Sequence, residues 1–448
     1  MTSKGDKRMN IGMIGLGYVG LVTAVGFAKL KHTLYCYDVD ERKIDMLLKK
    51  EAPIYEIGLQ ELLEDESVFG NVNIEPNMYE LVKKSDVIFI AVGTPSQSDG
   101  SANIEYVKAA VSGIVNLLID DGRSTYKVIV IKSTVPVGLT DRMQSIANDM
   151  LKDSPNIKVD FGFCPEFLRE GTAVKDFLNP ERVVIGSSTQ VAYEKICEVF
   201  NPFFERGVPQ INTNCVSAEI IKYASNIMLA TKIALLNEIA DYADSVGGRA
   251  ADISAAVGLD SRIGNKFLAA SLGFGGSCFP KDVKAFSHFS KVKGFDFPIA
   301  QSVMSSNEKH MMRQVEKIRY IANENKCRKI LVLGTAFKAN TDDVRESPAI
   351  KVIKGLLSHG FEIVVTDPKA LENTKTQLND SVEYTESIAN AIDGVGLIVI
   401  CTEWAEYKEF DYASIKNRMS NNIIVDLRNI LERGKVEEAG FRYYGIAN

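Results

Sequence analysis

The sequence predicts an α/β protein with two Rossmann-like domains of parallel sheet, joined by a long central helix and a helical connector. Short β-branched apolar runs alternate with helical patterns in the first third of the chain, as is typical of parallel strands with helical crossovers. The same pattern returns near residue 329, and a long helical run separates the two stretches. We therefore expect domains at residues 1–212, 213–325 and 326–448.

The composition is that of an ordinary globular protein. Of the 448 residues, 46% are hydrophobic and 25% charged, which is close to the globular average. The net charge of −6 gives no basic field to attract nucleic acid or an anionic membrane. Seven scattered cysteines, an odd number, favour reduced thiols in the cytoplasm over a disulfide framework. Four histidines and no Cys-x-x-Cys motif predict no metal site.

The first third begins with strands that we expect to be buried. The predicted strands are Ile11–Ile14, Thr33–Tyr37, Val87–Val92 and Val128–Ile131, and the predicted helices are Tyr18–Leu30, Glu41–Lys50 and Ile104–Ile119. Residues 9–28 carry no charge and by hydropathy also resemble a signal peptide or membrane anchor. Their regularly spaced glycines favour a strand, a loop and the buried face of a helix instead.

A glycine-rich motif, GLGYVG at residues 15–20, follows the first predicted strand, and Asp38 ends the second. Together they form the fingerprint of a dinucleotide-binding domain. Gly15 allows the tight turn, Gly17 lets a pyrophosphate approach, and Gly20 lets helix and strand pack. The Asp38 carboxylate would bind ribose hydroxyls and repel a 2′-phosphate, which favours NAD over NADP. The alternative is a glycine turn with no ligand. The cofactor-binding residues predicted here are Gly15, Gly17, Tyr18, Val19, Gly20 and Asp38.

Two further segments of this part carry polar groups suited to catalysis. The segment PEFLREG at 165–171 places Glu166 and Glu170 four residues apart in a loop, where one suits a general base. The alternative is an acid at a helix start with a partner four residues away. The segment STVP at 133–136 follows the fourth predicted strand, and its hydroxyls suit the binding of a water.

The long central helix is predicted from Ser217 to Ser245, with Ser217 as N-cap and Gly247 and Gly248 at its end. It is apolar around much of its circumference, so we expect it to be buried between domains or subunits. Lys222 and Asn226 interrupt the apolar run at positions i and i+4 and share one face. A cation and an amide there suit a developing oxyanion, and a solvated stripe is the alternative.

The segment GFGGSCFPKD at 273–282 is the most unusual in the chain. Its glycines suit the close approach of a substrate, and Cys278 is followed by Lys281 and Asp282. A thiol beside a cation can become a nucleophilic thiolate, and a buried small residue is the alternative. A cysteine that captures an aldehyde allows a second hydride transfer to NAD⁺ and yields a thioester, which water hydrolyses to an acid. A four-electron oxidation that uses two NAD⁺ is therefore predicted.

The last third repeats the plan of the first. The run KILVLGTAF, a helix at Ser347–His359 and the run FEIVVTDP ending at Asp367 parallel the glycine motif, its helix and Asp38. The turn here has one glycine, Gly334, so a pyrophosphate could not approach as closely.

Basic residues follow the strands of this last third, where open α/β sheets bind ligands. They are Lys338, Arg345 and Arg428. They favour a nucleotide other than the redox cofactor, and a solvated face is the alternative.

These segments resemble the nucleotide-sugar 6-dehydrogenases of the UDP-glucose/GDP-mannose dehydrogenase family, over nearly the whole chain. The motifs that carry the resemblance are GLGYVG, VGTP (92–95), STVPVG (133–138), PEFLREGTAVKDFLNPERVVIG (165–186), KYASN (222–226), DSRIGNKFL (260–268), FGGSCFPKD (274–282) and FKANTDDVRESP (337–348). The resemblance implies oxidation of UDP-glucose to UDP-glucuronate with NAD, by a homodimer or larger homo-oligomer. It implies that the first domain binds NAD, the central one serves dimerisation and catalysis, and the last binds the UDP-sugar.

The resemblance also implies roles for single residues. Cys278 would carry the thiohemiacetal and thioester, and Lys222 and Asn226 would stabilise oxyanions. Asp282 would act through a water on the substrate hydroxyl, and Glu166 would serve thioester hydrolysis. The implied catalytic residues are Cys278, Lys222, Asn226, Asp282, Glu166 and Thr134, the last holding a water. Further NAD contacts would be Lys43, Thr94, Thr134, Glu170, Lys281 and Arg345. The substrate site would comprise Glu166, Phe167, Leu168, Lys222, Asn226, Arg262 (from a neighbouring subunit), Phe267, Leu268, Ser271, Gly275, Phe337, Lys338 and Arg428.

One residue departs from the family pattern. Cys164 precedes Pro165, where the glucose enzymes have a small polar residue or Asn. The segment EFLRE also occurs in GDP-mannose dehydrogenases, whereas NPERVVIG and RIGNKFL favour UDP-glucose. The alternatives are a GDP-mannose or UDP-N-acetylhexosamine 6-dehydrogenase and, from another class, a non-catalytic protein that binds NAD and a nucleotide sugar. The retained catalytic set argues against the last.

Overall fold

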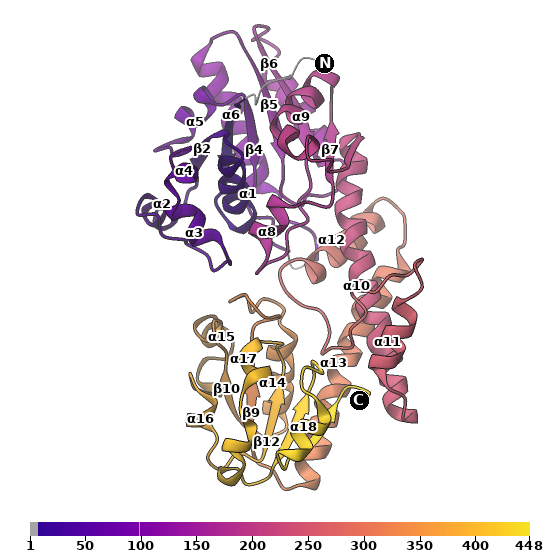
Figure 1. Ribbon diagram of the computed structural model, residues 1–448. Coiled ribbons are helices and arrows are strands. Elements are labelled where there is room, and N and C mark those ends of the chain that lie inside the picture. Colours follow the sequence, from indigo (N-terminus) through magenta and orange to yellow (C-terminus); the bar gives the residue numbers. More distant parts are fainter. Residues whose placement is uncertain (1–7, 98) are drawn as a thin grey trace. The chain divides into compact units, whose positions relative to one another are not determined.

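The computed structural model describes residues 8–97 and 99–448, which form two compact units, the first ending at Ala224 and the second beginning at Ser225 (Figure 1). Each unit contains one sheet, and the fold class predicted from the sequence is confirmed. No helix among the described residues is long and apolar enough to cross a membrane.

The first unit is built on an eight-stranded sheet of order β3-β2-β1-β4-β5-β6-β7-β8. Its strands are β1 (Asn10–Ile14), β2 (Thr33–Tyr37), β3 (Val72–Ile74), β4 (Val87–Ile90), β5 (Thr125–Ile131), β6 (Ile157–Phe163), β7 (Val183–Ser187) and β8 (Gln210–Thr213). Its helices are α1 (Tyr18–Lys29), α2 (Glu41–Leu48), α3 (Leu59–Glu64), α4 (Glu66–Phe69), α5 (Met78–Lys84), α6 (Glu105–Asp121), α7 (Leu139–Met150), α8 (Ala173–Leu178) and α9 (Gln190–Phe204). The pairing of β6 with β7 is antiparallel, which the sequence did not predict.

The strands of the first sheet are apolar without interruption because both faces are buried. In β4, Val87 and Phe89 lie in one hydrophobic core, whereas Ile88 and Ile90 lie in the core on the opposite face. Successive side chains of a strand point to opposite faces, so a strand covered on both sides must be apolar throughout.

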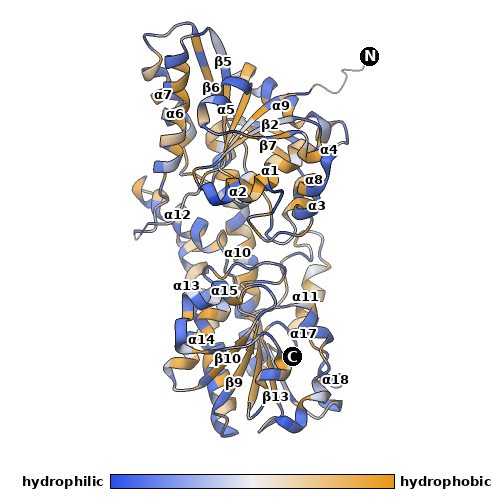
Figure 2. Cartoon of the chain, turned by 90° about the vertical axis from the view of Figure 1, so that its left-hand side faces the viewer, coloured by the Kyte–Doolittle hydropathy of each residue, from blue (hydrophilic) through white to orange (hydrophobic). Residues whose placement is uncertain are grey.

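The second unit has a six-stranded sheet of order β11-β10-β9-β12-β13-β14. Its strands are β9 (Lys329–Leu333), β10 (Glu362–Thr366), β11 (Glu383–Tyr384), β12 (Leu397–Ile400), β13 (Ile423–Asp426) and β14 (Arg442–Gly445). Its helices are α11 (Ala250–Gly258), α12 (Phe279–Val292), α13 (Pro298–Glu324), α14 (Pro348–Ser358), α15 (Leu371–Leu378), α16 (Ile388–Ala391), α17 (Ala405–Glu409) and α18 (Arg433–Glu438), with 3₁₀ turns η1 (Asn379–Ser381), η2 (Tyr412–Ser414) and η3 (Lys416–Arg418). Figure 2 shows the strands of this sheet mostly in the colours of hydrophobic residues.

The duplicated turn is visible in both units. Gly15 and Gly334 each have a φ of +91°, and each N–H donates to the last residue of the neighbouring strand, at 2.9 Å to Tyr37 O and 2.8 Å to Thr366 O. A positive φ of this size favours glycine. The two halves therefore share the turn that follows their first strand, as the parallel between the sequences predicts.

The long helix α10 (Cys215–Val246) begins earlier than predicted. The Asn214 side chain accepts a hydrogen bond from Ser217 N at 2.7 Å, so Asn214 is the N-cap and the assignment of Ser217 is wrong. The carboxamide oxygen of Asn214 reaches the third N–H of the helix, which is the usual geometry of such a cap. The predicted end is confirmed, since Gly247 has a φ of +79° and Gly248 N donates to Ala243 O at 2.8 Å, a Schellman motif.

Candidate active site

The glycine loop between β1 and α1 has the shape that a dinucleotide requires. A Cβ on Gly15 would lie 2.7 Å from Ala91 O, and one on Gly20 would lie 1.8 Å from Gly15 O. Glycine is therefore required at both positions, because any side chain would collide with the backbone packed against it. A Cβ on Gly17 would meet nothing within 4 Å, so its glycine leaves open space next to the first N–H groups of α1. The loop therefore fits the pyrophosphate of NAD.

Asp38 stands at the end of β2 beside this loop. Its Oδ2 accepts a hydrogen bond from Leu16 N at 2.6 Å, and its Oδ1 accepts one from Asp40 N at 2.9 Å. Lys43 Nζ lies 3.6 Å from Oδ2. The structure thus brings the predicted cofactor residues Asp38 and Lys43 together. It adds a role that the sequence did not reveal, because Asp38 also holds the glycine loop.

The loops after β4 and β5 hold each other through hydroxyl groups. Thr94 Oγ1 donates to Thr134 O at 2.9 Å, and Ser133 Oγ donates to Val92 O at 2.7 Å. These strands are neighbours in the sheet, so their carboxyl ends meet at one edge. The predicted residues Thr94 and Thr134 are therefore adjacent.

Glu166 and Lys222 form a buried ion pair with side chains only 7% and 4% exposed. Lys222 Nζ donates to Glu166 Oε1 at 2.7 Å and to Glu166 O at 2.9 Å, and Leu168 N donates to Oε2 at 2.6 Å. Burial alone would raise the pKa of Glu166, but the Lys222 charge and its hydrogen bond, the Leu168 N–H and the Lys132 charge outweigh it, and the pKa lies below its usual range. Glu166 is therefore a carboxylate, as a general base must be.

Lys132 is a residue that sequence reasoning missed. It follows β5, is 5% exposed, and interacts electrostatically with Glu166, Cys164 and Lys222. Burial lowers the pKa of Lys132. The available signal was a lysine at the end of the apolar run VIVI, because a buried lysine needs a partner.

Cys164, the departure from the family pattern, is also buried. Burial raises the pKa of its thiol to about 12. The thiolate is the reactive form of a cysteine, so Cys164 is an inert thiol in this structure and does not compete with a nucleophile.

Cys278 caps α12 in the second unit, ahead of a polar cluster. Asp282 N donates to Cys278 O at 2.9 Å. The Asp282 side chain, 1% exposed, accepts from Asn226 Nδ2 and from Lys281 Nζ, each at 2.6 Å. The structure therefore brings together Asn226, Cys278, Lys281 and Asp282. The start of a helix stabilises negative charge, which suits a thiolate or an oxyanion there.

The glycines before Cys278 have a reason that the sequence did not show. A Cβ on Gly273 would lie 2.6 Å from Asn307 Oδ1, and one on Gly275 would lie 2.4 Å from Glu346 O. A Cβ on Gly276 would lie 2.7 Å from the Phe337 ring. The glycines let the loop pack against neighbouring segments of its own unit. The close approach of a substrate to them stays a prediction.

A second polar network supports the same loop at Ser271. Ser271 N donates to Asn237 Oδ1 at 2.9 Å, and Ser271 O lies 2.8 Å from His310 Nε2. His310, 1% exposed, also contacts Asp241 Oδ1 through Nδ1 at 2.9 Å. Sequence reasoning missed these supports, since nothing local marks residues of α10 and α13 as partners of this loop.

The predicted substrate residues of the last third meet at strand ends. Arg428 Nε donates to Cys401 O at 2.8 Å, and its Nη2 donates to Phe337 O at 2.8 Å. Lys338 Nζ lies 5.5 Å from the centre of the Phe337 ring. Arg345, which was predicted to contact NAD, forms an ion pair with Asp343 at 2.7 Å.

Further predicted substrate residues lie on the loop after α11. Phe267 has a φ of +62° and its ring centre lies 6.4 Å from that of Phe279. Leu268 is buried. Arg262 is exposed and pairs with Asp260 at 2.6 Å.

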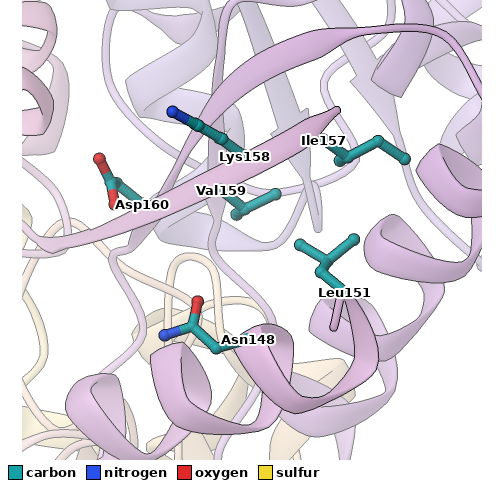
Figure 3. Close-up of a pocket in the computed structure, with 6 residues that line it drawn as sticks. All are labelled: Asn148, Leu151, Ile157, Lys158, Val159 and Asp160. Atoms are coloured by element: carbon teal, nitrogen blue, oxygen red, sulfur yellow. The ribbon is translucent and has the colours of Figure 1, made fainter. Parts of the chain in front are cut away.

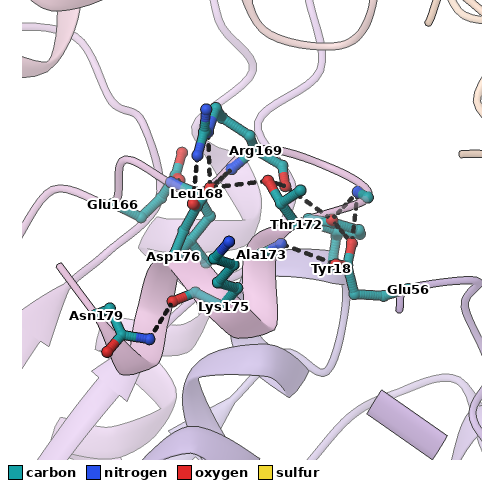
Figure 4. A network of polar contacts seen from close by, with 11 residues as sticks. Tyr18, Glu56, Glu166, Leu168, Arg169, Thr172, Ala173, Lys175, Asp176 and Asn179 are labelled. Atoms are coloured by element: carbon teal, nitrogen blue, oxygen red, sulfur yellow. Dashed lines mark hydrogen bonds and ion pairs between the residues drawn. The ribbon is translucent and has the colours of Figure 1, made fainter. Parts of the chain in front are cut away.

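The segment 165–173 is a tightly bonded loop (Figure 4). Arg169 donates to Asp176 through N, Nε and Nη2 at 3.0, 2.9 and 2.7 Å. Both carboxylates of PEFLREG lie before α8, which begins only at Ala173, so the alternative of an acid at a helix start does not hold.

One hollow of the surface lies apart from the predicted site residues. A hollow of about 270 Å³ lies between α7 and β6 and contains no predicted site residue (Figure 3). Its lining residues are Asn148, Leu151, Ile157, Lys158, Val159 and Asp160. Within residues 8–97 and 99–448, no group of three or more His, Cys, Asp or Glu side chains is arranged to hold a metal ion.

Family models match three consecutive parts of the chain. The NAD binding domain of the UDP-glucose/GDP-mannose dehydrogenase family matches residues 9–204, the central domain 216–309 and the UDP binding domain 331–433. The chain is 41% identical over 436 residues to the UDP-glucose 6-dehydrogenase TuaD of Bacillus subtilis (strain 168), covering 97% of this chain and 92% of that protein.

Solved structures show the same likeness. A UDP-glucose dehydrogenase from Pyrobaculum islandicum has a TM-score of 0.88 and 37% identity, over 100% of this chain and 99% of that one. A UDP-D-ManNAc dehydrogenase from Pyrococcus horikoshii has a TM-score of 0.83 and 26% identity, over 98% and 99% of the two chains.

Proposed function

Because the chain belongs to the UDP-glucose/GDP-mannose dehydrogenase family, we propose that it oxidises UDP-glucose to UDP-glucuronate in four electrons, with two NAD⁺. The proposal rests on Cys278, which lies at the start of α12 next to the hydrogen-bonded cluster of Asn226, Asp282 and Lys281. All three domain models of the family match the chain that contains this cysteine. An alcohol dehydrogenase needs no such cysteine. A cysteine serves a reaction that continues past the aldehyde, because its covalent adduct with the aldehyde can lose a second hydride.

The sugar is proposed from the similarities. Identity is 41% and 37% to proteins named for UDP-glucose, but 26% to one named for UDP-D-ManNAc, at similar coverage. The basic and aromatic residues Phe337, Lys338 and Arg428 at strand ends of the second unit support a uridine nucleotide there, since strand ends of such sheets bind ligands.

The side chains are suited to distinct steps. Bound NAD⁺ supplies the hydride acceptor for both oxidations. Asp282, a buried carboxylate, takes the proton of the C6 hydroxyl through a water. Cys278 Sγ adds to the aldehyde to form a thiohemiacetal, and loss of a second hydride leaves a thioester. Glu166 then takes a proton from the water that cleaves the thioester, and Cys278 is released.

Lys222 and Asn226 are proposed to stabilise the oxyanions of these steps. They stand one turn apart on α10. Each already holds a predicted catalytic carboxylate, Glu166 for Lys222 and Asp282 for Asn226. The same N–H groups that position the carboxylates are therefore suited to stabilising negative charge.

The proposal includes a homodimer formed through α10. Among the exposed large apolar residues of α10, five that are between 37% and 70% exposed are spaced by seven, four, three and four residues, which places them on one face. They are Met228, Leu235, Ile239, Tyr242 and Val246. A contiguous exposed apolar stripe marks an interaction surface. We also place the protein in the cytoplasm, where a reducing pool keeps Cys278 a thiol.

A panel of nucleotide sugars tests the proposal. We expect NADH formation with UDP-glucose, about two NADH per sugar consumed, and far less with GDP-mannose or UDP-N-acetylhexosamines. Cys278→Ala is expected to abolish acid formation while NADH binding persists. If this variant releases UDP-glucuronate at the wild-type rate, the cysteine mechanism is wrong. If another sugar is preferred, the substrate is wrong but the mechanism stands.

A further inference from the structure

Glu56 is a buried carboxylate that is not among the predicted site residues. It lies in the connection between α2 and α3 and is only 5% exposed. A carboxylate so deeply buried needs hydrogen-bond donors, because burial without them costs several kcal/mol. The residues that donate hydrogen bonds to Glu56 indicate its role in the structure.

The donors come from two loops that are far apart in the sequence. Gly171 N donates to Glu56 Oε2 at 2.7 Å, and Ala173 N donates to Oε1 at 2.8 Å. The Tyr18 hydroxyl donates to Oε2 as well, and its oxygen accepts from Gly171 N at 3.0 Å. Figure 4 shows the side chains of Tyr18 and Glu56 meeting beside the loop.

Each of these donors belongs to a loop with a proposed ligand. Tyr18 is the first residue of α1 and part of the glycine motif proposed to bind the pyrophosphate of NAD. Gly171 and Ala173 end the loop 165–173, which carries Glu166 and Glu170. The φ of +79° at Gly171 is a conformation that favours glycine.

The loop 165–173 is thereby fixed at both ends. At its start, the Lys222 ammonium holds the carboxylate and the carbonyl of Glu166. At its end, Glu56 and Tyr18 hold Gly171 and Ala173. Burial, followed by the hydrogen bond to Glu56, raises the pKa of Tyr18 well above its usual range, so this hydroxyl keeps the proton that it donates.

We infer that Glu56 is a positioning residue that couples the NAD-binding glycine loop to the substrate loop 165–173. A ligand that orders one loop also orders the other through the shared carboxylate, so the second ligand pays less conformational entropy. The two ligands then bind with positive cooperativity, and the effect is reciprocal. This inference rests on the proposed function, because it takes NAD and UDP-glucose as the two ligands.

The test replaces the carboxylate with an amide. Glu56→Gln keeps the size of the side chain and one acceptor oxygen, but its NH₂ group cannot accept a hydrogen bond. The affinity for NADH is measured by titration with and without UDP-glucose, a combination that does not turn over. In the wild type we expect UDP-glucose to tighten NADH binding by about fivefold or more. In Glu56→Gln we expect this ratio to fall towards one.

A matched control separates coupling from loss of a buried carboxylate. Glu75 belongs to the same unit, is also 5% exposed, and pairs with Lys84 at 2.9 Å. Glu75→Gln is expected to keep the wild-type ratio. If the ratio is unchanged in Glu56→Gln, is one already in the wild type, or falls equally in Glu75→Gln, the inference is overturned.

Hydrogen exchange provides a second measurement, and substitution of a residue with only a structural role would not change its response to NADH. NADH alone is expected to slow amide exchange in the peptide that contains Gly171 and Ala173, in the wild type but not in Glu56→Gln. Equal protection in both proteins contradicts the coupling. Tyr18→Phe, which removes only a hydroxyl, tests the same contact if Glu56→Gln does not fold.

Failure of the proposed function would look different. The wild type would then bind NADH normally but neither bind nor oxidise UDP-glucose. A wild type that oxidises UDP-glucose but shows no cooperativity would overturn the role of Glu56 alone.

Discussion

At the scale of single residues, burial and hydrogen bonding define the surroundings of the carboxylates that are proposed to act in catalysis. Glu166 and Asp282 are both buried, and each is held as an acceptor by a cation and by an N–H group. Asp241 shows the same arrangement in a supporting role, where it accepts from His310, Arg313 and Gln314. The pKa values of Glu166 and Asp241 lie below their usual range, so these two carboxylates make the stability of the fold dependent on pH.

Asp241 is expected to stabilise the second unit above its own pKa. Burial alone would raise that pKa, but His310 and Arg313 outweigh it, and the pKa lies below its ordinary value of 3.8. A lowered folded-state pKa means that the contribution is complete above the unfolded pKa and is lost as the pH falls through the folded one.

Urea unfolding across acid pH measures this contribution. The wild type is expected to be more stable than Asp241→Asn at pH 6, and the difference should shrink below about pH 4. Asp252 pairs with Arg249 with its side chain 65% exposed, and Asp252→Asn should show little difference at either pH. A constant difference for Asp241→Asn would contradict the assignment.

At the scale of elements, α10 differs most from what its sequence predicts, both at its N-cap and in which of its apolar residues are buried. Its cap is Asn214 and not Ser217, because the side chain three residues earlier is the one that reaches an unpaired N–H. Its apolar residues do not all face the core of the chain, since one stripe remains exposed. A helix with apolar residues around much of its circumference does not reveal from its sequence which of these residues are buried by the same chain and which remain exposed.

The N-cap assignment predicts that substitutions of Asn214 and Ser217 change the free energy of unfolding by different amounts. Asn214→Ala is expected to lower the free energy of unfolding by about 1 kcal/mol, because it leaves a helical N–H without its acceptor. Ser217→Ala should change it by no more than a few tenths of that. Urea denaturation of both variants at one pH decides the matter, and the reverse order would restore Ser217 as the cap.

The exposed stripe of α10 predicts the state of association. Leu235 is 56% exposed at the middle of the stripe, and Leu235→Glu is expected to convert a dimer to a monomer, since a charge cannot be buried there without a partner. Light scattering after size exclusion measures the mass.

Tyr106 on α6 serves as the control for this substitution. It is 58% exposed in the first unit, so Tyr106→Glu should leave the dimer intact. A wild type that is monomeric at micromolar concentration contradicts the proposed interface.

At the scale of the whole molecule, two copies of one turn have diverged in function. Asp38 accepts two backbone N–H groups and lies beside the open space at Gly17. Its counterpart Asp367 accepts four backbone N–H groups, from Thr335, Ala336, Lys369 and Ala370, and the Trp404 indole. A carboxylate with that many donors has no capacity left for a ribose.

The divergence predicts opposite phenotypes for equivalent substitutions. Asp367→Asn is expected to lower the free energy of unfolding by about 2–4 kcal/mol, because an amide cannot accept from all these donors, while the KM for NAD⁺ stays unchanged. Asp38→Asn should cost less stability and reduce the preference for NAD⁺ over NADP⁺ by about tenfold, since it removes the charge that repels a 2′-phosphate. Unfolding curves and the ratio of kcat/KM values test both. A normal cofactor preference in Asp38→Asn would show that Asp38 only holds the loop.

The sequence by itself determined the fold class, the strands β1, β2, β4 and β5, the glycine loop and the family. These follow from local patterns: an apolar run of strand length, a turn that needs a positive φ at Gly15, and an acidic residue after the second strand. The antiparallel β7 was missed because two central strands with both faces buried look alike in either direction.

Only the tertiary structure decided which polar groups pair. The hydrogen bonds of Glu56 with Tyr18 and Gly171, and of His310 with Ser271, join residues 38 to 115 positions apart. The electrostatic interaction of Lys132 with Glu166 joins the ends of two strands that are neighbours in the sheet. Local sequence cannot report such pairs, because a side chain's partner is set by how the elements pack. The structure also showed that Gly273, Gly275 and Gly276 serve packing within the protein, since what a missing Cβ makes room for depends on the atoms that lie opposite.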